Sequence, residues 1–343
     1  MMEKCSLNST IINEVRDITL YLPKSYAEPG YSPMRYPVVY LLDGEQYGCL
    51  IRELINHLSE TYTLPEVILV AITSGTHRFR DLTPSASTMD WQGQSCDYLQ
   101  DTGGLSSFLE FIEKELVPHI DTTYRTSSHR TLVGHSLAGL AVCQSLLVQP
   151  HLFQGLVSID ASLWWDHQCV VKALEENQHE IGCRESSGVL KRRFYCAYAK
   201  HEIGGPNDFG ALLRSNQRFI DLLDQAPNPD LAVASAQFSN ETHQSVWLPG
   251  VLAGLQFVFQ GHRLLNGWAP DLETVKKHYR KYSERMGFDY LPPERLVDSL
   301  AWNLYPKLDS QVALELLHDN VKTYAGSAHA RESLEQYLSV GMC

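Results

Sequence analysis

The stretch Arg130-Thr-Leu-Val-Gly-His-Ser-Leu-Ala-Gly-Leu140 decides the fold, because it joins a short apolar strand to an apolar helical segment through small residues. A nucleophilic serine needs this setting, since on a sharp strand-to-helix turn the hydroxyl stands clear of the sheet and the next peptide N–H faces the substrate. Small neighbours are required because the turn is strained and the chain passes close by. Ala138 occupies the second glycine position of the Gly-x-Ser-x-Gly pattern, which we interpret as a variant. Ser136 is therefore the predicted nucleophile.

The composition is typical of a large enzyme. The chain has 343 residues, of which 44% are hydrophobic and 20% charged, enough for one large domain with an appendage. Its 28 basic and 40 acidic residues give a net charge of −12, which argues against nucleic-acid binding. No apolar run approaches the roughly 20 residues of a membrane span. The start of the chain lacks the basic and apolar regions of a leader, so we expect a cytoplasmic protein that does not bind membranes.

The eight cysteines are scattered along the chain, with no close pair of the Cys-x-x-Cys kind. Scattered cysteines favour free thiols in a reducing compartment over a disulfide framework or a zinc site. We therefore predict neither a bound metal nor an organic cofactor.

Apolar strands and amphipathic helices alternate along most of the chain. The predicted strands are 17–22, 37–42, 67–72, 131–133, 155–159, 194–199 and 231–238, and helical spacing appears at 49–59, 104–118, 208–223 and 252–259. Pro118 is expected to end the second of these helices. Strands that are apolar on both faces belong to sheets covered on both sides. The fold class is therefore α/β, with a mostly parallel sheet and helices on both faces.

The order of the elements selects the other catalytic residues. In a doubly wound hydrolase the acid and the histidine follow the serine, each on a loop past a strand end. His243 alone lies on the loop after the last predicted strand, so it is the predicted general base. Glu202 follows the penultimate strand and is the predicted acid, while Asp208, Asp160, Asp166 or no acid at all remain alternatives. His201, beside Glu202, is interpreted as a surface neighbour.

An oxyanion formed at the reacting carbonyl needs preorganised N–H donors. The backbone N–H of Leu137, directly after the serine, is the first predicted donor. The second is expected from the turn after the strand at 37–42, where Glu45 follows Asp43-Gly44 and can supply its backbone N–H.

Residues 73–104 show no periodicity, and so long an irregular stretch is more often functional or mobile than neutral. It contains Arg78 and Arg80. Either Arg80 and Asp81 form an ion pair that stabilises the loop, or one or both arginines line the mouth of the substrate site, and both are kept as candidate substrate-binding residues. Trp164 and Trp165 follow a strand end, where they either line the substrate pocket or pack in the core.

Five motifs occur in a fixed order, and together they resemble those of the Putative esterase family of α/β-hydrolases. They are Tyr36-Pro-Val-Val-Tyr-Leu-Leu-Asp-Gly44, Arg78-Phe-Arg-Asp-Leu-Thr-Pro84, Gly134-His-Ser-Leu-Ala-Gly139, Ser162-Leu-Trp-Trp165 and Thr242-His243. That family includes esterase D, enterobactin-type trilactone esterases, feruloyl esterases and mycolyltransferases, and the resemblance covers about residues 12–261. It implies that Ser136 and His243 act as nucleophile and base, and that the backbone of Glu45 supplies an oxyanion donor. The Arg-Asp-Leu-Thr-Pro and Ser-Leu-Trp-Trp stretches are most similar to the siderophore trilactone branch.

Residues 266–343 have a different pattern, and we expect a catalytic domain at 1–265 followed by this helical region. Helical patterns occur at 272–286, 294–304, 311–324 and 328–340. They resemble a single tetratricopeptide-like unit, and one unit is too short to build a peptide-binding groove. The region is interpreted as a packing or homodimer-forming appendage, with partner binding as the alternative.

Taken together, these patterns predict a serine carboxylic-ester hydrolase that acts on a small-molecule ester through an acyl-enzyme. Acyl transfer to an alcohol is the main alternative, because only the acceptor differs. A noncatalytic interaction protein that uses the helical tail is the alternative from another class, although such a protein needs neither Ser136 nor His243.

Overall fold

The computed structural model describes residues 1–31, 34–177, 192–201, 209–264, 271–304 and 310–340. Within these residues, eight strands form one sheet in the order β1-β2-β4-β3-β5-β6-β7-β8. The strands are β1 (Met2–Ser9), β2 (Glu14–Tyr21), β3 (Tyr36–Leu41), β4 (Ile68–Ile72), β5 (Thr126–His135), β6 (Gly155–Ile159), β7 (Arg192–Ala199) and β8 (Leu231–Phe238). From β4 to β8 all neighbours are parallel, whereas β1 and β2 are antiparallel. The predicted α/β fold class is confirmed.

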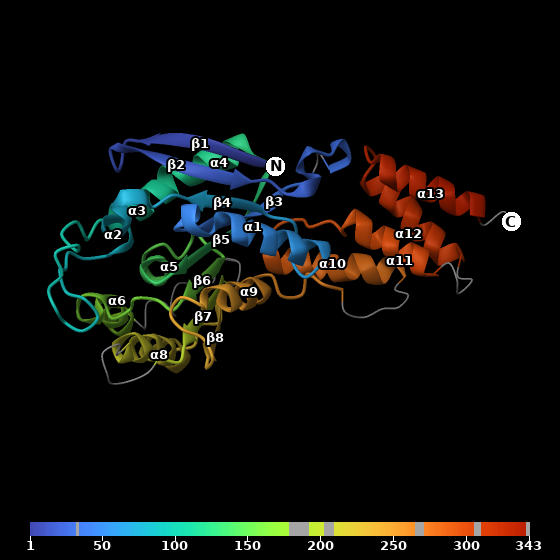
Figure 1. The fold of residues 1–343 in the computed structure, drawn as a ribbon. Helices are drawn as coiled ribbons and strands as arrows, with labels where there is room; N and C mark the ends of the chain where they lie inside the picture. Colours follow the sequence, from blue (N-terminus) through green and yellow to red (C-terminus); the bar gives the residue numbers. More distant parts are fainter. Residues whose placement is uncertain (32–33, 178–191, 202–208, 265–270, 305–309, 341–343) are drawn as a thin grey trace.

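Helices cover both faces of this sheet (Figure 1). One face carries α1 (Gly44–Glu60) and α9 (Trp247–Val258); the other carries α3 (Leu105–Phe111), α4 (Val117–Thr123), α5 (Leu137–Val148), α6 (Trp165–Glu176) and α8 (Gly210–Gln225). Strand β3 shows why both layers are needed, since Val38 and Tyr40 belong to one apolar cluster and Val39 and Leu41 to the other. A strand apolar on both faces must be covered on both, which explains the continuous hydrophobic runs of the sequence.

Pro118 does not end the helix predicted at 104–118. The helix continues from α3 through a π-helical turn, Ile112–Leu116, into α4, and Pro118 lies in the first turn of α4. A proline lacks an N–H and clashes with the preceding turn inside a regular helix. The wider π turn just before Pro118 changes the hydrogen-bond pattern at this point, so the helix can continue through the proline.

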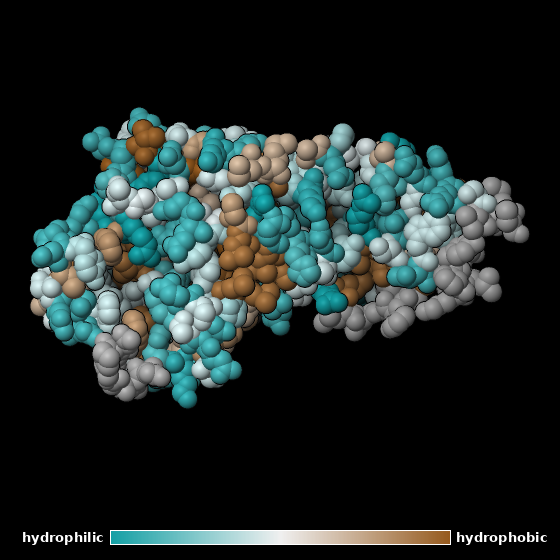
Figure 2. Space-filling model, viewed as in Figure 1, coloured by the Kyte–Doolittle hydropathy of each residue, from teal (hydrophilic) through white to brown (hydrophobic). Residues whose placement is uncertain are grey.

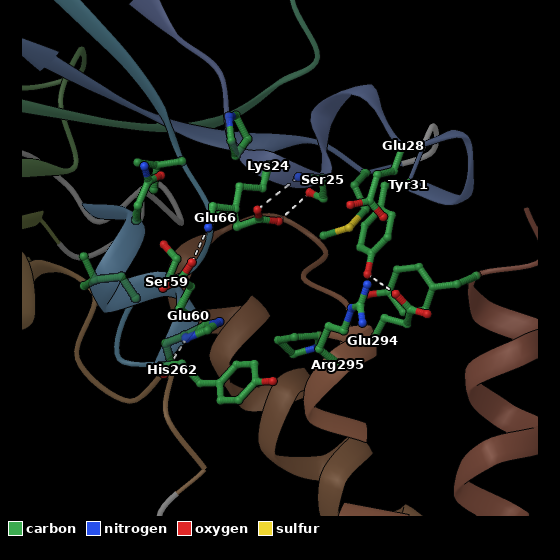
Figure 3. A pocket seen from close by; sticks show the side chains of 18 of the residues that line it. Lys24, Ser25, Glu28, Tyr31, Ser59, Glu60, Glu66, His262, Glu294 and Arg295 are labelled. Atoms are coloured by element: carbon green, nitrogen blue, oxygen red, sulfur yellow. Dashed lines mark hydrogen bonds and ion pairs between the residues drawn. The ribbon is translucent and has the colours of Figure 1, made fainter. Parts of the chain in front are cut away.

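The C-terminal region consists of helices α10 (Leu272–Met286), α11 (Glu294–Leu304), α12 (Ser310–Thr323) and α13 (Ala328–Val340), close to the predicted ranges. Their apolar side chains share one cluster with those of α1 and α9, so the region packs onto the helix layer of the sheet. A cavity of about 550 Å³ lies between it and the loop after β2, and the two segments touch beside the cavity. Figure 3 shows Tyr31 and Glu294 meeting at the rim of this cavity. The division into two domains at residue 265 stays a prediction.

The surface is mostly polar on the face drawn in Figure 2, with an apolar patch near its centre, where Figure 1 places α1 and α9. Leu50 of α1 and Leu248 of α9 are 46% and 42% exposed. Within the described residues, no helix is both long and apolar enough to cross a membrane.

Candidate active site

Ser136 lies at the turn between β5 and α5, where the sequence predicted a nucleophile. Its backbone has φ 61° and ψ −119°, a conformation that side-chain-bearing residues rarely adopt and that is often found at functional turns. A Cβ at Gly134 would lie 2.3 Å from the carbonyl oxygen of Ala138, so no larger residue fits the first motif position. Ala138 itself is fully buried and is accommodated beside that glycine. The turn leaves the serine partly exposed, within reach of a substrate.

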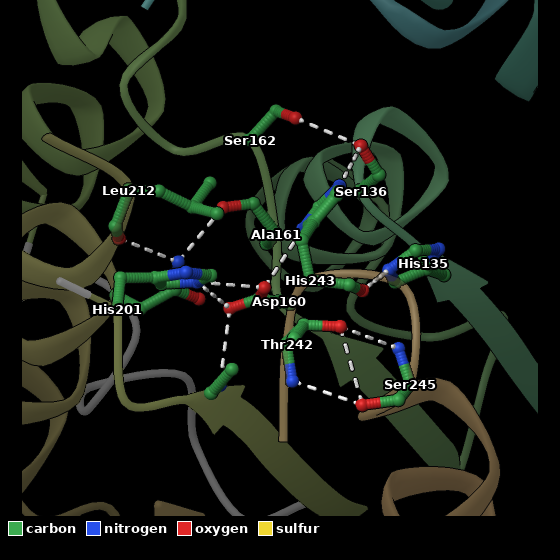
Figure 4. Close-up of polar contacts among 12 residues, drawn as sticks. His135, Ser136, Asp160, Ala161, Ser162, His201, Leu212, Thr242, His243 and Ser245 are labelled. Carbon is green, nitrogen blue, oxygen red and sulfur yellow. Dashed lines mark hydrogen bonds and ion pairs between the residues drawn. The ribbon is translucent and has the colours of Figure 1, made fainter. Parts of the chain in front are cut away.

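The structure brings Ser136 and His243 together across 107 residues of chain. Nε2 of His243 lies 3.1 Å from Oγ of Ser136, and Nδ1 lies 2.7 Å from Oδ2 of Asp160 (Figure 4). His243 follows β8 and Asp160 follows β6, so both side chains reach the carboxyl edge of the sheet. A serine hydroxyl, an imidazole and a buried carboxylate in this order form the arrangement that activates a serine nucleophile.

The predicted acids differ in where they lie. Glu202 and Asp208 fall outside the described residues. Asp166 lies in α6, is partly exposed, and forms none of the described hydrogen bonds with the serine or the histidine. Asp160, an alternative in the sequence analysis, is the carboxylate that contacts His243. Burial raises the pKa of Asp160, but hydrogen bonds from His201 and His243 outweigh it and hold the pKa below its ordinary value.

The interpretation of His201 as a surface residue was wrong. Only 8% of the residue is exposed, and its Nε2 lies 2.8 Å from Oδ2 of Asp160. The sequence could not show this, because the contact depends on β6 and β7 being neighbours in the sheet.

His135, the variable position of the serine motif, supports the loop that carries His243. Burial lowers the pKa of His135 to about 4, so its ring is neutral near pH 7, and Nε2 donates to the carbonyl oxygen of His243 over 2.7 Å. The two rings also pack with their centroids 4.6 Å apart. No role of His135 was predicted from the sequence, although its place directly before the serine could have indicated one.

The two predicted oxyanion donors begin helices. Leu137 is the first residue of α5 and Glu45 the second of α1, and N–H groups in a first helical turn have no partner within the helix. The carboxylate of Glu45 accepts the N–H groups of Ser74 and Gly75, at 3.1 and 2.9 Å, which ties this turn to the loop after β4.

Arg78 and Arg80 have different positions. Arg78 lines the cavity at Ser136, and its Nε and Nη2 reach the carboxylate of Asp43 at 2.8–3.0 Å, so it also holds the turn before α1. Arg80 does not line that cavity. It donates to Glu14 and Asp81 at 2.9 and 2.8 Å, the loop-stabilising ion pair considered as the alternative.

A cavity of about 300 Å³ opens at Ser136 and His243. Its lining includes six large aromatic side chains, those of Phe79, Trp91, Tyr98, Trp164, Trp165 and Phe209. Three of these come from the stretch at 73–104, which therefore contributes to the site. Trp165 is almost fully buried, with its Nε1 donating to the carbonyl of Ser85, whereas Trp164 is partly exposed to the cavity.

Asp160, His201 and His243 form, among the described residues, one group whose ligand atoms all lie within 4.8 Å, close enough to hold a metal ion. Two atoms bound tetrahedrally to one zinc ion lie about 3.4 Å apart. The nitrogen-to-oxygen distances here are 2.7–3.0 Å, which are those of direct hydrogen bonds. We therefore interpret the group as a hydrogen-bonded network.

This fold and this site define an α/β-hydrolase with a serine nucleophile. Residues 9–192 match the family described as Putative esterase, so the chain belongs to that family and the predicted resemblance is confirmed. The ferri-bacillibactin esterase BesA of Bacillus subtilis is 31% identical over 263 residues, which are 71% of this chain and 86% of that protein. The prediction that the chain is a carboxylic-ester hydrolase is confirmed by this family membership.

Solved structures show the same fold. An IroE-like serine hydrolase from Shewanella oneidensis has a TM-score of 0.79 at 30% identity, covering 92% of this chain and 98% of that one. A cover of 92% extends into the C-terminal helices. The enterobactin esterase FES from Shigella flexneri is 18% identical with a TM-score of 0.57, and the match covers 76% of this chain and 59% of that one.

Proposed function

We propose that the protein hydrolyses the esters of a siderophore-type trilactone through an acyl-enzyme on Ser136. The observation that carries the proposal is the hydrogen-bonded series Ser136, His243 and Asp160, of which Ser136 and His243 line an aromatic cavity. Relatives named as esterases of ferri-bacillibactin and enterobactin support the substrate class.

In the proposed reaction Nε2 of His243 takes the proton of Ser136 as Oγ attacks the ester carbonyl. The N–H groups of Leu137 and Glu45 stabilise the oxyanion, and Asp160 stabilises the imidazolium. Collapse of the intermediate breaks the carbon–oxygen bond, and the departing alkoxide takes the proton from His243. Water, activated by the same imidazole, then cleaves the acyl-enzyme and restores the serine.

The cavity favours an acyl group with a flat ring. Trp91 and Phe209 pack in parallel with centroids 5.4 Å apart, and Trp164 lies at an angle to Trp91, so the wall offers several ring faces. Arg78 adds positive charge at the mouth, where an acidic protein otherwise repels anions. A volume of about 300 Å³ is at the low end for ligand sites. It suits one arm of a larger ester at a time.

The test is turnover of a macrocyclic trilactone with three aromatic arms, followed by mass spectrometry of its linear products. Wild type should open the ring, while Ser136→Ala should not. Ser107→Ala, on the exposed side of α3, is the matched control and should behave as wild type. If wild type hydrolyses simple esters but not this trilactone, the proposed substrate class is rejected while the esterase activity stands. Oxygen-18 from water in the released acid supports hydrolysis, and transfer to an added alcohol supports the acyltransferase.

The expectations of a cytoplasmic protein and of a homodimer formed through α10–α13 stay predictions. The six cysteines within the described residues are all free, which suits a reducing compartment. Cell fractionation and light scattering check the two expectations.

A further inference from the structure

His201 is a buried polar side chain for which the proposed reaction has no step. It lies two residues after the end of β7, and its side chain is 4% exposed. Its Nε2 faces both oxygens of Asp160, at 3.0 Å from Oδ1 and 2.8 Å from Oδ2 (Figure 4). His201 is not among the residues that line the cavity. Within the described part of the chain, its contacts with the site are those with Asp160 and with the rings of Phe209 and His243.

The Asp160 carboxylate depends on these contacts because its side chain is fully buried. A buried charge is unfavourable unless hydrogen bonds replace water around it. His243 donates to Oδ2, and the backbone N–H of Ala199 reaches Oδ1 only at 3.3 Å. Among the described residues, the 3.3 Å contact from Ala199 is then the one hydrogen bond that Oδ1 would keep without His201.

The contact also fixes the orientation of the carboxylate. Rotation of an aspartate carboxylate about its last torsion is only weakly restricted. Because Nε2 of His201 bridges both oxygens, rotation away from Nδ1 of His243 would break the bridge. Phe209 packs against both imidazoles, with centroids 5.4 Å from His201 and 6.1 Å from His243, and so limits movement of the two rings.

We propose that His201 is a positioning residue that holds the Asp160 carboxylate in the orientation in which it directs His243 toward Ser136. The inference rests on the proposed function, since it assigns His201 to the support of that same serine. The active-site series is then four residues long, with an imidazole on each side of one carboxylate.

The test measures how fast a fluorophosphonate labels Ser136, together with kcat and KM on p-nitrophenyl butyrate. His201→Leu removes the N–H, and we expect labelling and kcat to fall about 10- to 100-fold with KM nearly unchanged, as for loss of a hydrogen bond to a charged group. His201→Gln places an amide N–H near the former Nε2 and should recover most of the rate. His318→Leu, on the exposed side of α12, is the matched control.

A double-mutant cycle separates positioning from simple packing. If His201 acts through Asp160, His201→Leu should lower kcat and labelling only slightly further in an Asp160→Asn background, because the two changes remove the same function. An equal loss in both backgrounds, or no recovery by His201→Gln, would overturn the inference. Labelling of His201→Leu at the wild-type rate would overturn it while leaving the proposed function intact. Wild type that is not labelled at all would overturn both.

Discussion

His243 uses both of its ring nitrogens, and each has its own partner. Nδ1 faces the Asp160 carboxylate and Nε2 faces the Ser136 hydroxyl, at 2.7 and 3.1 Å. A carboxylate accepts hydrogen bonds only, so the proton of the neutral ring lies on Nδ1. Nε2 is therefore left free to accept the serine proton. Asp160 therefore sets the tautomer of His243.

Replacing Asp160 and Glu202 one at a time should show which carboxylate is the acid of the active site. Asp160→Asn can no longer favour the Nδ1–H tautomer, and we expect kcat on p-nitrophenyl butyrate to fall by about four orders of magnitude. Glu202→Gln should retain turnover close to that of wild type. A large loss in Glu202→Gln, with little change in Asp160→Asn, would return the role to the residue favoured by the sequence.

Removing the imidazole tests the base directly. His243→Ala leaves Ser136 without a proton acceptor, so kcat should fall by roughly four to six orders of magnitude. KM should change little because the aromatic wall remains. Steady-state kinetics and a melting curve check this, and His318→Ala serves as the control for a lost exposed histidine. Near wild-type turnover in His243→Ala would assign the base elsewhere.

The serine and the histidine could be predicted from the sequence, but the carboxylate could not be ranked correctly. The motif around Ser136 is local, and His243 is identified by its place after the last strand. Asp160 and Glu202 follow neighbouring parallel strands, β6 and β7, whose ends lie at the same edge of the sheet. Which of them reaches Nδ1 depends on side-chain direction. The positive φ of 43° at Asp160 helps to set that direction and has no signal in the sequence.

At the scale of elements, the strand-to-helix turn tolerates a methyl at one end and not at the other. Gly134→Ala would place a Cβ 2.3 Å from the carbonyl oxygen of Ala138, and we expect the free energy of unfolding to fall by about 3 kcal/mol. Labelling of Ser136 should also slow, since the turn must shift. Urea unfolding and fluorophosphonate labelling measure the two effects.

The companion change restores the usual motif and acts as the control. Ala138→Gly removes a buried methyl and adds backbone freedom, which costs about 1 kcal/mol. Its kcat should stay within a few-fold of wild type. Equal losses in Gly134→Ala and Ala138→Gly would show that contact with the Ala138 carbonyl does not limit the turn.

Most elements could be predicted because their apolar periodicity reflects the layer that each one contacts. The four C-terminal helices are examples, since each has one apolar stripe. Strand β1 was missed because it lies at the edge of the described sheet, where it pairs with β2 and no side chain before Ser9 is fully buried. Helix α6 was missed because Asp166, His167 and Gln168, directly after its first residue, have positive φ, so no regular helical pattern marks its start.

At the scale of the whole molecule, Glu294 links the C-terminal helices to the part of the chain before β3. Its carboxylate is fully buried and accepts hydrogen bonds from Tyr31, from Ser327 at 2.8 Å and from His329 at 3.0 Å. Removing the centre of a buried charged network typically costs 3–5 kcal/mol. Glu294→Ala should therefore lower the free energy of unfolding by about 3 kcal/mol.

The turnover of Glu294→Ala shows whether the change disturbs the whole fold or only the region around Glu294. Because Glu294 lines a different cavity and not the one at Ser136, kcat of Glu294→Ala should remain near wild type at low temperature. Glu315→Ala, which removes an exposed carboxylate of α12, should change neither quantity. A Glu294→Ala protein as stable as wild type in urea would mean that the C-terminal helices are held by apolar packing alone.

Three buried imidazoles make the stability of the whole molecule depend on pH. Burial is the main cause that lowers the pKa of His129 and His262 to about 3 and that of His135 to about 4. In the unfolded chain the pKa of histidine is about 6.5. Between about pH 6.5 and 4 the unfolded chain binds protons that the folded protein does not. The free energy of unfolding therefore falls as the pH is lowered through this range.

Each imidazole should contribute about 1.4 kcal/mol per pH unit, giving a slope of up to about 4 kcal/mol per unit near pH 5. Glu66, whose pKa burial raises, works against this slope. Urea unfolding at pH 7, 6 and 5 measures it. His129→Leu should reduce the slope by the contribution of one imidazole, about 1.4 kcal/mol per pH unit. Phe259→Leu, which changes the ring packed against His129, should lower stability equally at every pH. An unchanged slope in His129→Leu would show that this imidazole is charged in the folded protein.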